Sequence, residues 1–343
     1  MRNLVIIGNG FDLAHDLKTS YGDFIAWLIK KYWGKRDSEK KFFDYLDAKN
    51  TGYLNEYNVE DLEKTADIIN EFLKYKKHIP FKNNFLETIL SDYTKNKNWC
   101  DIEELYFNEL TSFTRFTTPE KLNEDLFKIK EELINYLKEE KKKLKHLQIY
   151  SEFFEKIGMN DIILNFNYTN TVKSYLNPDS HFHNLIHIHG NLYNHIDNVI
   201  FGYAASHESK KKLIDRKDPE YTKNIKPFLY NLDSNERKLL DFLAIDGDIN
   251  VIILGHSCGD SDKLILQQIF THSKVKSIKT CYYENKEHYF QQQINIYKIM
   301  DNEACFSRLF PITSSSRMPQ KVTDESIKEE FKKNIIDFIK PSN

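Results

Sequence analysis

The stretch Leu4–Asp12 reads LVIIGNGFD, an apolar run followed at once by two glycines and an acidic residue. The uninterrupted apolar run Leu4–Ile7 is typical of a strand that is buried on both faces of a parallel sheet. Gly8 and Gly10 would then let backbone N–H groups approach phosphate oxygens closely, with a helix N-terminus adding a favourable dipole. The third glycine of a G-x-G-x-x-G motif is missing because position 13 is Leu13, so a tight turn without a ligand is an alternative. The candidate ligand contacts in this turn are Gly8, Asn9, Gly10 and Asp12.

The composition is that of a globular protein. Of the 343 residues, 40% are hydrophobic and 29% are charged, and the formal net charge is −2. We therefore expect neither a membrane nor a specific nucleic-acid partner. The 4 cysteines form no C-x-x-C pair, which argues against a structural zinc site and for a reducing compartment. No apolar window approaches the roughly 20 residues of a membrane span, so a cytoplasmic location is expected.

Hydrophobic periodicity divides the chain into a sheet-forming part and a helical part. From Tyr21 to about His146 apolar residues recur at helical spacing and strand-like runs are nearly absent. Later strands are expected at Asp161–Asn165, Leu185–His189, Val199–Phe201, Asn250–Leu254 and Ser277–Tyr283. Helices are expected at Pro119–His146, Tyr168–Tyr175, Ser234–Leu243, Asp260–His272 and Glu325–Ile339. The pattern predicts an α/β fold with a Rossmann-like parallel sheet, formed by residues 1–20 and 158–343, and a large helical insertion, residues 21–157.

Polar motifs follow two of the later strands. Asn165–Asn170 reads NFNYTN and comes where side chains project into the ligand crevice of an open α/β sheet; an N-cap followed by a helix is equally consistent with it. His187–Asn191 reads HIHGN, and His189 before a glycine at a strand end is typical of a general base. His181, His183, His187 and His189 alternate, but they span too far for one ion because a strand rises about 3.3 Å per residue. We expect no metal site.

A fourth motif, Gly255–Asp262, reads GHSCGDSD and lies between a strand and a helix. It matches G-x-S-x-G, the nucleophile elbow of α/β-hydrolases, with Ser257 as the nucleophile. The expected order of acid and then histidine is poorly met, because Asp301 follows both His272 and His288. The competing interpretation is a second nucleotide-contacting loop.

The order of the four motifs resembles the abortive-infection AbiH family of bacterial phage-defence proteins, from residue 3 to about residue 270. Trp99, Asp101 and Glu103 also resemble a W-x-D-x-E element of that family. AbiH proteins in turn resemble the sirtuin-like NAD-consuming fold. The resemblance implies that Asn167 and His189 are catalytic. It also implies that the substrate NAD contacts Gly8, Gly10, Gly255 and Ser257. Their neighbours in the motifs are further expected contacts, namely Asn9, Asp12, Asn165, His256 and Asp260.

Two departures from the sirtuin pattern refine this expectation. Thr169 stands where sirtuins have Asp, which affects the orientation of nicotinamide. The cysteine pairs of the sirtuin zinc module are missing, which favours a plain NAD glycohydrolase over a deacylase.

The hypothesis that follows is a phage-defence effector that hydrolyses NAD+ at the nicotinamide–ribose bond. Asn167 would position the ribose and a water molecule, and His189 would accept a proton. A phage-derived protein is the expected trigger, and a homo-oligomer stays open. Two alternatives also stay open: a non-catalytic sensor of NAD or ADP-ribose, which Thr169 favours, and a serine hydrolase centred on Ser257.

Overall fold

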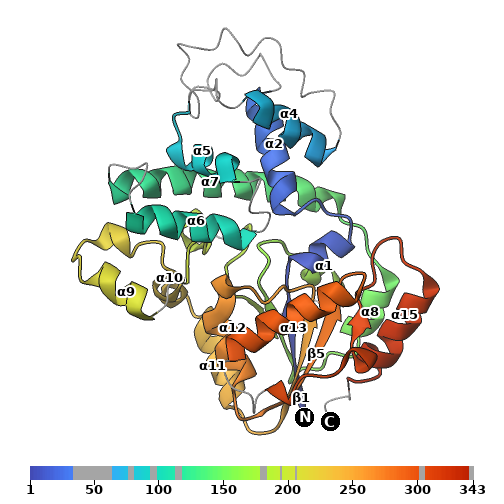
Figure 1. Ribbon diagram of the computed structural model, residues 1–343. Coiled ribbons are helices and arrows are strands. Elements are labelled where there is room, and N and C mark those ends of the chain that lie inside the picture. The colour runs from blue at the N-terminus through green and yellow to red at the C-terminus, as the bar shows by residue number, and fades with distance from the viewer. Residues whose placement is uncertain are drawn as a thin grey trace. The chain divides into compact units, whose positions relative to one another are not determined.

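The computed structural model describes residues 1–33, 64–75, 81–92, 99–112, 118–177, 184–193, 195–204, 207–300 and 306–339. The chain forms two compact units. Unit 1 contains Met1–Leu17, Leu137–Ile200 and Lys226–Asn343, and unit 2 contains Lys18–Tyr136 and Phe201–Ile225. Figure 1 shows the sheet of unit 1 and the helices of unit 2.

A six-stranded sheet forms the centre of unit 1, and every strand pair in it is parallel. Its strands are β1 (Arg2–Ile7), β2 (Ile162–Asn165), β3 (Leu185–His187), β4 (Ile249–Leu254), β5 (Val275–Tyr282) and β6 (Ser316–Arg317). The order across the sheet is β3-β2-β1-β4-β5-β6. This is the Rossmann order, in which the chain extends the sheet on one side of β1 and then, from β4, on the other. The predicted Rossmann-like sheet is confirmed, and its switch point lies between the carboxyl ends of β1 and β4.

Two hydrophobic clusters cover the two faces of the sheet. Successive side chains of a strand point to opposite faces, so Leu4 and Ile6 join one cluster whereas Val5 and Ile7 join the other. Helices α11 (Asn235–Ala244), α12 (Lys263–Phe270) and α13 (Lys286–Met300) supply the first cluster. Helices α1 (Asn9–Ala14), α8 (Gln148–Phe154) and α15 (Glu325–Phe331) supply the second. Unit 1 is therefore a three-layer α/β/α arrangement (Figure 1).

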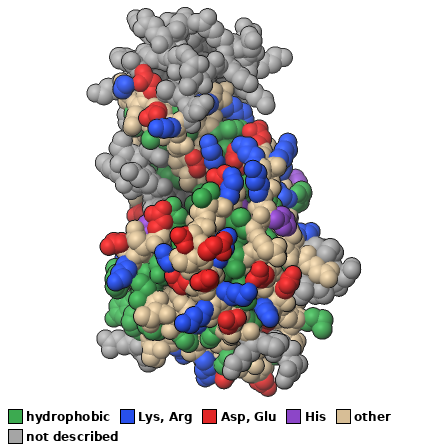
Figure 2. All heavy atoms as spheres, turned by 90° about the vertical axis from the view of Figure 1, so that its right-hand side faces the viewer, with side chains coloured by type: hydrophobic (Ala, Val, Ile, Leu, Met, Phe, Trp, Pro, Cys, Tyr) green, Lys and Arg blue, Asp and Glu red, His purple; other side chains and the backbone are tan. Residues whose placement is uncertain are grey.

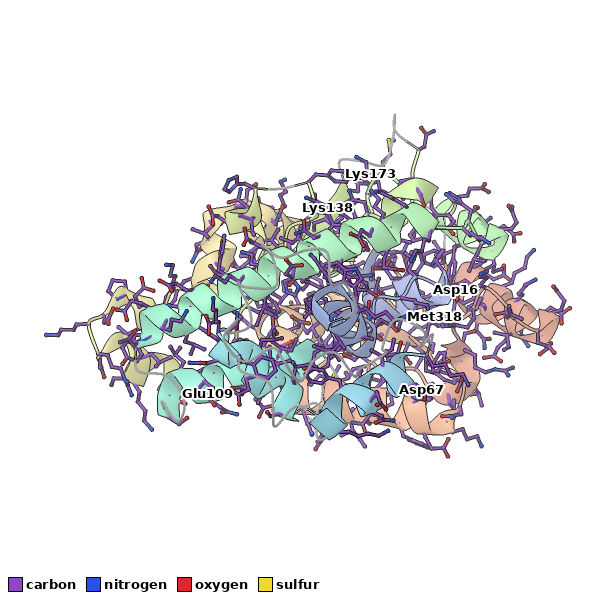
Figure 3. All side chains as sticks on the ribbon, turned by 90° about the horizontal axis from the view of Figure 1, so that it is seen from above. Asp16, Asp67, Glu109, Lys138, Lys173 and Met318 are labelled. Atoms are coloured by element: carbon purple, nitrogen blue, oxygen red, sulfur yellow. The ribbon has the colours of Figure 1, made fainter. Side chains whose placement is uncertain are left out.

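Short helical turns complete unit 1. They are η3 (Lys141–Lys143), η4 (Val172–Tyr175), η6 (Ile196–Asn198), α10 (Lys226–Leu229), η8 (Tyr230–Leu232), η9 (Asp260–Asp262), η10 (Ile312–Ser314) and the π-helical η11 (Lys332–Ile336). After β6 the chain returns to α1, because the N–H of Lys321 donates to the carbonyl oxygen of Ala14 at 2.8 Å. Figure 3 accordingly shows Asp16, just after α1, and Met318, just after β6, on the same side.

Unit 2 is helical throughout most of its described length. Its helices are α2 (Tyr21–Trp33), α4 (Thr65–Tyr75), α5 (Asn84–Asp92), α6 (Trp99–Ser112), α7 (Pro119–Glu140, whose last turn belongs to unit 1) and α9 (His207–Ile214), with the turn η7 (Pro219–Tyr221). Along α7, Leu122, Leu126, Ile129 and Leu133 are buried, as their helical spacing predicts.

The two units differ from the sequence-based domain boundaries at three places, the shortest of which is residues 18–20, expected in the core domain but part of unit 2. Residues 137–157 belong to unit 1, because Tyr150, Phe153 and Phe154 of α8 pack with Val5 and Ile7 of β1. Residues 201–225, expected in the core domain, belong to unit 2, where Tyr203 forms a bridge with Ile225.

Several element boundaries also differ from the sequence-based expectations. Val199–Phe201 forms no strand, and β3 ends at His187. The helix expected at Tyr168–Tyr175 is reduced to the 3-10 turn η4, because side-chain hydrogen bonds of Asn165 hold the preceding loop. The two-residue strand β6 was not expected. Such short elements depend on neighbouring strands more than on local sequence.

Acidic and basic side chains are interspersed over the face drawn in Figure 2. Within the described ranges, no helix combines the length and the hydropathy that crossing a bilayer requires.

Candidate functional site

Two glycine-containing turns meet at the switch point of the sheet. Gly8 follows β1 and Gly255 follows β4. A Cβ atom on Gly8 would lie 2.5 Å from the Cα of His256, and one on Gly10 would lie 2.7 Å from the Cα of Gly255. Gly255 has a φ of +67°, and a Cβ atom there would overlap the backbone nitrogen of Phe11. The absence of side chains at these glycines therefore allows the two turns to pack directly against each other.

The backbone N–H groups of the first turn donate hydrogen bonds within the protein. Gly8 donates to the carbonyl oxygen of Leu254 at 3.0 Å, and Gly10 donates to that of Gly255 at 2.8 Å. Phe11 donates to the carbonyl oxygen of Gly8 at 2.9 Å. In this conformation the three groups are not available to phosphate oxygens. In this structure Gly8, Gly10 and Gly255 allow the two turns to pack together. Contact of the N–H groups of Gly8 and Gly10 with a phosphate stays a prediction.

Asp12, within α1, is a buried carboxylate with one unpaired oxygen. Its side chain is 1% exposed, and its Oδ2 accepts a hydrogen bond from Thr169 Oγ1 at 2.5 Å. Its Oδ1 has no partner among the described residues. Burial raises the pKa of Asp12 to about 6, and the side chains of Thr169, Thr171 and Asn167 offset this only in part. An N–H or O–H group of a ligand would satisfy Oδ1. Asn9, at the start of the same helix, is half-buried.

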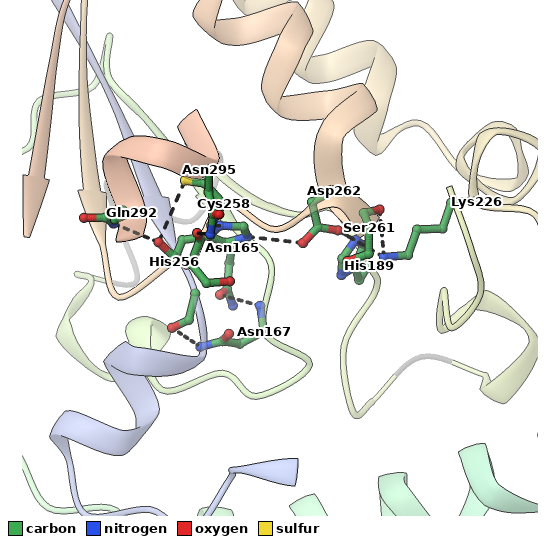
Figure 4. Close-up of polar contacts among 12 residues, drawn as sticks. Asn165, Asn167, His189, Lys226, His256, Cys258, Ser261, Asp262, Gln292 and Asn295 are labelled. Carbon is green, nitrogen blue, oxygen red and sulfur yellow. Dashed lines mark hydrogen bonds and ion pairs between the residues drawn. The ribbon is translucent and has the colours of Figure 1, made fainter. Parts of the chain in front are cut away.

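Asn165, the last residue of β2, organises the loop that follows. Its Nδ2 donates to the carbonyl oxygen of Thr169 at 3.0 Å, and its Oδ1 accepts from the N–H of Asn167 at 3.1 Å. Asn167 Nδ2 donates in turn to the carbonyl oxygen of Gly8 at 2.9 Å (Figure 4). Two predicted site residues from distant parts of the chain are thus joined. Within the described residues, Asn167 Oδ1 accepts no hydrogen bond.

His189 lies in the turn after β3 and faces a buried ion pair (Figure 4). Its Nε2 is 3.2 Å from Asp262 Oδ1 and 3.1 Å from Tyr230 Oη. Lys226 Nζ lies 3.0 Å from the same Asp262 oxygen, and the Lys226 side chain is 2% exposed. Burial and then the charge of Lys226 lower the pKa of His189. Against the effect of burial, Lys226 and His189 hold the pKa of Asp262 well below its usual range.

His256 contacts the second oxygen of the same carboxylate. Its Nε2 is 3.3 Å from Asp262 Oδ2, and its Nδ1 accepts from the N–H of Cys258 at 2.9 Å. The ring of Phe166 packs edge-on against both His256 and His189, with centroid distances of 4.3 and 5.4 Å. Asp262 therefore connects two imidazoles in an apolar surrounding.

Ser257 does not have the surroundings of a hydrolase nucleophile. Its side chain is exposed, and the left-handed residues of this turn are Gly255 and Cys258, with φ values of 67° and 55°. His256 is already bonded to Cys258 and Asp262, and among the described residues no histidine contacts the Ser257 hydroxyl. The geometry of this turn, among the described residues, therefore gives the elbow interpretation no support. Asp260 is exposed and forms no contact with the other predicted site residues that are described.

The remaining candidates have other contacts. His187 Nδ1 is 3.1 Å from Asn165 Nδ2, and His181 and His183 lie outside the described residues. In the part of the chain that the structure describes, no group of three His, Cys, Asp or Glu side chains could hold a metal ion. Of the W-x-D-x-E element, the side chains of Trp99 and Asp101 are outside the description, and Glu103 accepts from the N–H of Gly202 at 3.4 Å within unit 2.

Three residues of the network were not identified as site residues from the sequence. Asp262 ends the fourth motif but was not among the predicted site residues. Lys226 and Tyr230 belong to no motif. Their only sequence signal is weak, because a lysine and a tyrosine in a polar segment are usually solvated.

A family profile matches most of this chain. The profile of the family described as Bacteriophage abortive infection AbiH matches residues 4–284, which include β1 and the four motifs. No curated protein sequence matches this chain. Because the match covers most of the chain, this protein belongs to the bacteriophage abortive infection AbiH family.

Proposed function

We propose that this AbiH protein acts in abortive infection by hydrolysing NAD+ at the nicotinamide–ribose bond. The observation that carries the proposal is His189, an imidazole buried beside the ionised Asp262 at the carboxyl edge of a Rossmann sheet. A dinucleotide is the ligand that this strand order binds most often, at the switch point between β1 and β4.

The imidazole of His189 is suited to accept a proton. Its pKa is lowered, chiefly by burial, so it is neutral at pH 7. A water molecule that attacks ribose C1′ would give its proton to His189 while the bond to nicotinamide breaks. General-base catalysis of this kind contributes about 10²–10⁴-fold in rate.

The polar groups around the two turns suit the nicotinamide end of the substrate. Asp12 Oδ1 and Asn167 Oδ1 are acceptors without partners among the described residues, and Asp12 carries negative charge above pH 6. The nicotinamide ring of NAD+ is cationic, and its carboxamide and ribose carry donors. Asn167 would orient the ribose or the attacking water, and Asp12 would meet a donor of the substrate.

The test measures nicotinamide release and NAD+ content in cells that express the protein with a phage-derived trigger, the proposed partner. Asn167→Ala and His189→Ala should each reduce nicotinamide release by at least about 10²-fold and abolish toxicity. His195→Ala is the matched control, because its imidazole is 74% exposed and, within the described part of the chain, pairs only with Asp197. This variant should behave as the wild type does.

Two outcomes would contradict the proposal. Toxicity that persists in both Asn167→Ala and His189→Ala would remove these residues from the mechanism. Calorimetric binding of NAD+ without turnover under any trigger would identify a sensor in place of an enzyme.

A further inference from the structure

Lys226 and Asp262 form an ion pair that the proposed reaction does not yet use. Lys226 is 1% exposed, and its Nζ also donates to the carbonyl oxygen of Ser261 at 3.2 Å. A buried ion pair contributes little net stability, since taking both charges out of water costs about as much as their attraction returns. Stability alone is therefore a weak reason for these charges to stand beside two histidines.

The two carboxylate oxygens of Asp262 fix the hydrogen positions on both imidazoles. Oδ1 faces Nε2 of His189 at 3.2 Å, and Oδ2 faces Nε2 of His256 at 3.3 Å. An ionised carboxylate only accepts hydrogen bonds, so each Nε2 carries the hydrogen. His256 shows the same assignment independently, because its Nδ1 accepts from the N–H of Cys258. In a neutral imidazole with hydrogen on Nε2, Nδ1 is the basic atom.

We propose that Asp262 is a positioning residue that holds His189 in the Nε2–H tautomer, so that Nδ1 accepts the proton, while Lys226 keeps Asp262 ionised and His189 uncharged. This inference rests on the proposed NAD+ hydrolysis. Within the described residues Nδ1 of His189 has no hydrogen-bond partner, which leaves it available to a water molecule.

The charged and titratable side chains that face His189 come from four segments of the chain. Asp262 lies on η9, Lys226 on α10 and Tyr230 on η8, and His256 follows β4. Because Lys226 and Asp262 cancel, an added proton on His189 would leave the buried cluster with a net positive charge. The imidazole therefore rests unprotonated, and Asp262 still aligns the imidazolium that forms.

The proton balance of the step is complete without a further reactant. The water oxygen forms a bond to ribose C1′ as the bond from C1′ to the nicotinamide nitrogen breaks. The electron pair of the broken bond leaves with the neutral nicotinamide. The water proton moves to Nδ1 of His189 and later passes to solvent. The products are nicotinamide, ADP-ribose and one proton.

The first experiment observes the histidines of the wild type, and variants serve only to assign the signals. Nitrogen NMR of the ¹⁵N-histidine-labelled wild type should show hydrogen on Nε2 and none on Nδ1 for both His189 and His256, with assignment by His189→Gln and His256→Gln. A hydrogen on Nδ1 of His189, or an imidazolium at pH 7, would overturn the proposal whether or not the protein is active.

The second experiment uses Asp262→Asn, whose amide can no longer accept from both imidazoles. We expect kcat for nicotinamide release to fall about 10²–10⁴-fold with little change in KM. Lys226→Met should move the acid limb of the kcat/KM profile to higher pH by about 1–2 units, because Asp262 then acts on His189 uncompensated. Asp241→Asn is the control, because the Asp241 carboxylate is 58% exposed and forms an ion pair with Arg237. This variant should change neither kcat nor the pH of the acid limb.

The outcomes separate this proposal from the reaction itself. Nicotinamide release that Asp262→Asn leaves unchanged would overturn the positioning role and leave the hydrolase standing. The Nε2–H tautomer on His189 without NAD+ cleavage under any trigger would refute the hydrolase and still support the assignment of the histidines. A merely structural role would lower the active fraction without moving the acid limb.

Discussion

Asp12→Asn tests whether burial of the Asp12 carboxylate, beside the turn that contains Gly8 and Gly10, lowers the free energy of unfolding once the carboxylate is ionised. The pKa of Asp12 is raised from 3.8 to about 6, chiefly by burial. The folded protein therefore binds the Asp12 proton more tightly than the unfolded chain does. A group with a raised folded pKa contributes stability that is complete below the unfolded value, 3.8, and is lost as pH rises through about 6.

The magnitude follows from the difference of the two pKa values. A shift of roughly 2 units corresponds to about 3 kcal/mol, of which about 2 kcal/mol falls between pH 4 and pH 7. Asp12→Asn removes the titration and keeps the shape. We compare the free energies of unfolding of the wild type and of Asp12→Asn. The wild-type value minus the variant value should decrease by about 2 kcal/mol as pH rises from 4 to 7.

Urea unfolding at a series of pH values measures this difference. Burial lowers the pKa of His15 and of His187 to about 4, so both destabilise the fold as pH falls below 6.5. These contributions are common to both proteins and cancel in the subtraction. Asp260→Asn, which makes the same substitution at an exposed carboxylate, is the control for the exchange of the side chain itself. A flat difference for Asp12→Asn would refute the buried, partly unpaired state of Asp12.

Two further substitutions test the packing around the site. Gly10→Ala should lower the free energy of unfolding by about 1–3 kcal/mol, because the new Cβ atom would lie 2.7 Å from the Cα of Gly255. Helix propensity alone predicts that this substitution stabilises the protein, and that result would contradict the packing argument. Lys226→Met should lower the free energy of unfolding in urea by about 3–5 kcal/mol, because it leaves Asp262 buried without its cation. The control is Lys276→Met, at a surface ion pair with an N···O distance of 3.9 Å, and it should lower this free energy by less than about 1 kcal/mol.

The parts of the fold that the sequence predicts are those encoded locally. The run Leu4–Ile7 is apolar on both faces, and only a central parallel strand buries both faces, so β1 could be identified from its residues alone. The polar motifs after β2 and β4 were located for the same reason, since a buried run followed by turn residues marks a strand end. The single residues Asn167 and His189 could thus be assigned to the carboxyl edge of the sheet.

What the sequence does not predict depends on partners far along the chain. Lys226 and Asp262 are separated by 36 residues and meet only because α10 and η9 lie together in the folded unit. The backbone hydrogen bonds of Gly10 are equally hidden, because they are made with Gly255, on another strand's turn. Val199–Phe201 has strand-like residues but finds no neighbouring strand, so it stays a loop.

The packing of the two turns bears on which end of a dinucleotide this edge of the sheet suits. A phosphate here would need free N–H donors, whereas Gly8 and Gly10 donate to carbonyl oxygens of the protein. It would also meet the carboxylate of Asp12, which is ionised at pH 7 and buried, where water screens its charge poorly. The nicotinamide ribose, with its cationic ring, carboxamide N–H donors and ribose hydroxyls, presents no negative charge to Asp12. We therefore propose that Asp12 and Asn167 face the nicotinamide ribose, and not the pyrophosphate, in the proposed reaction.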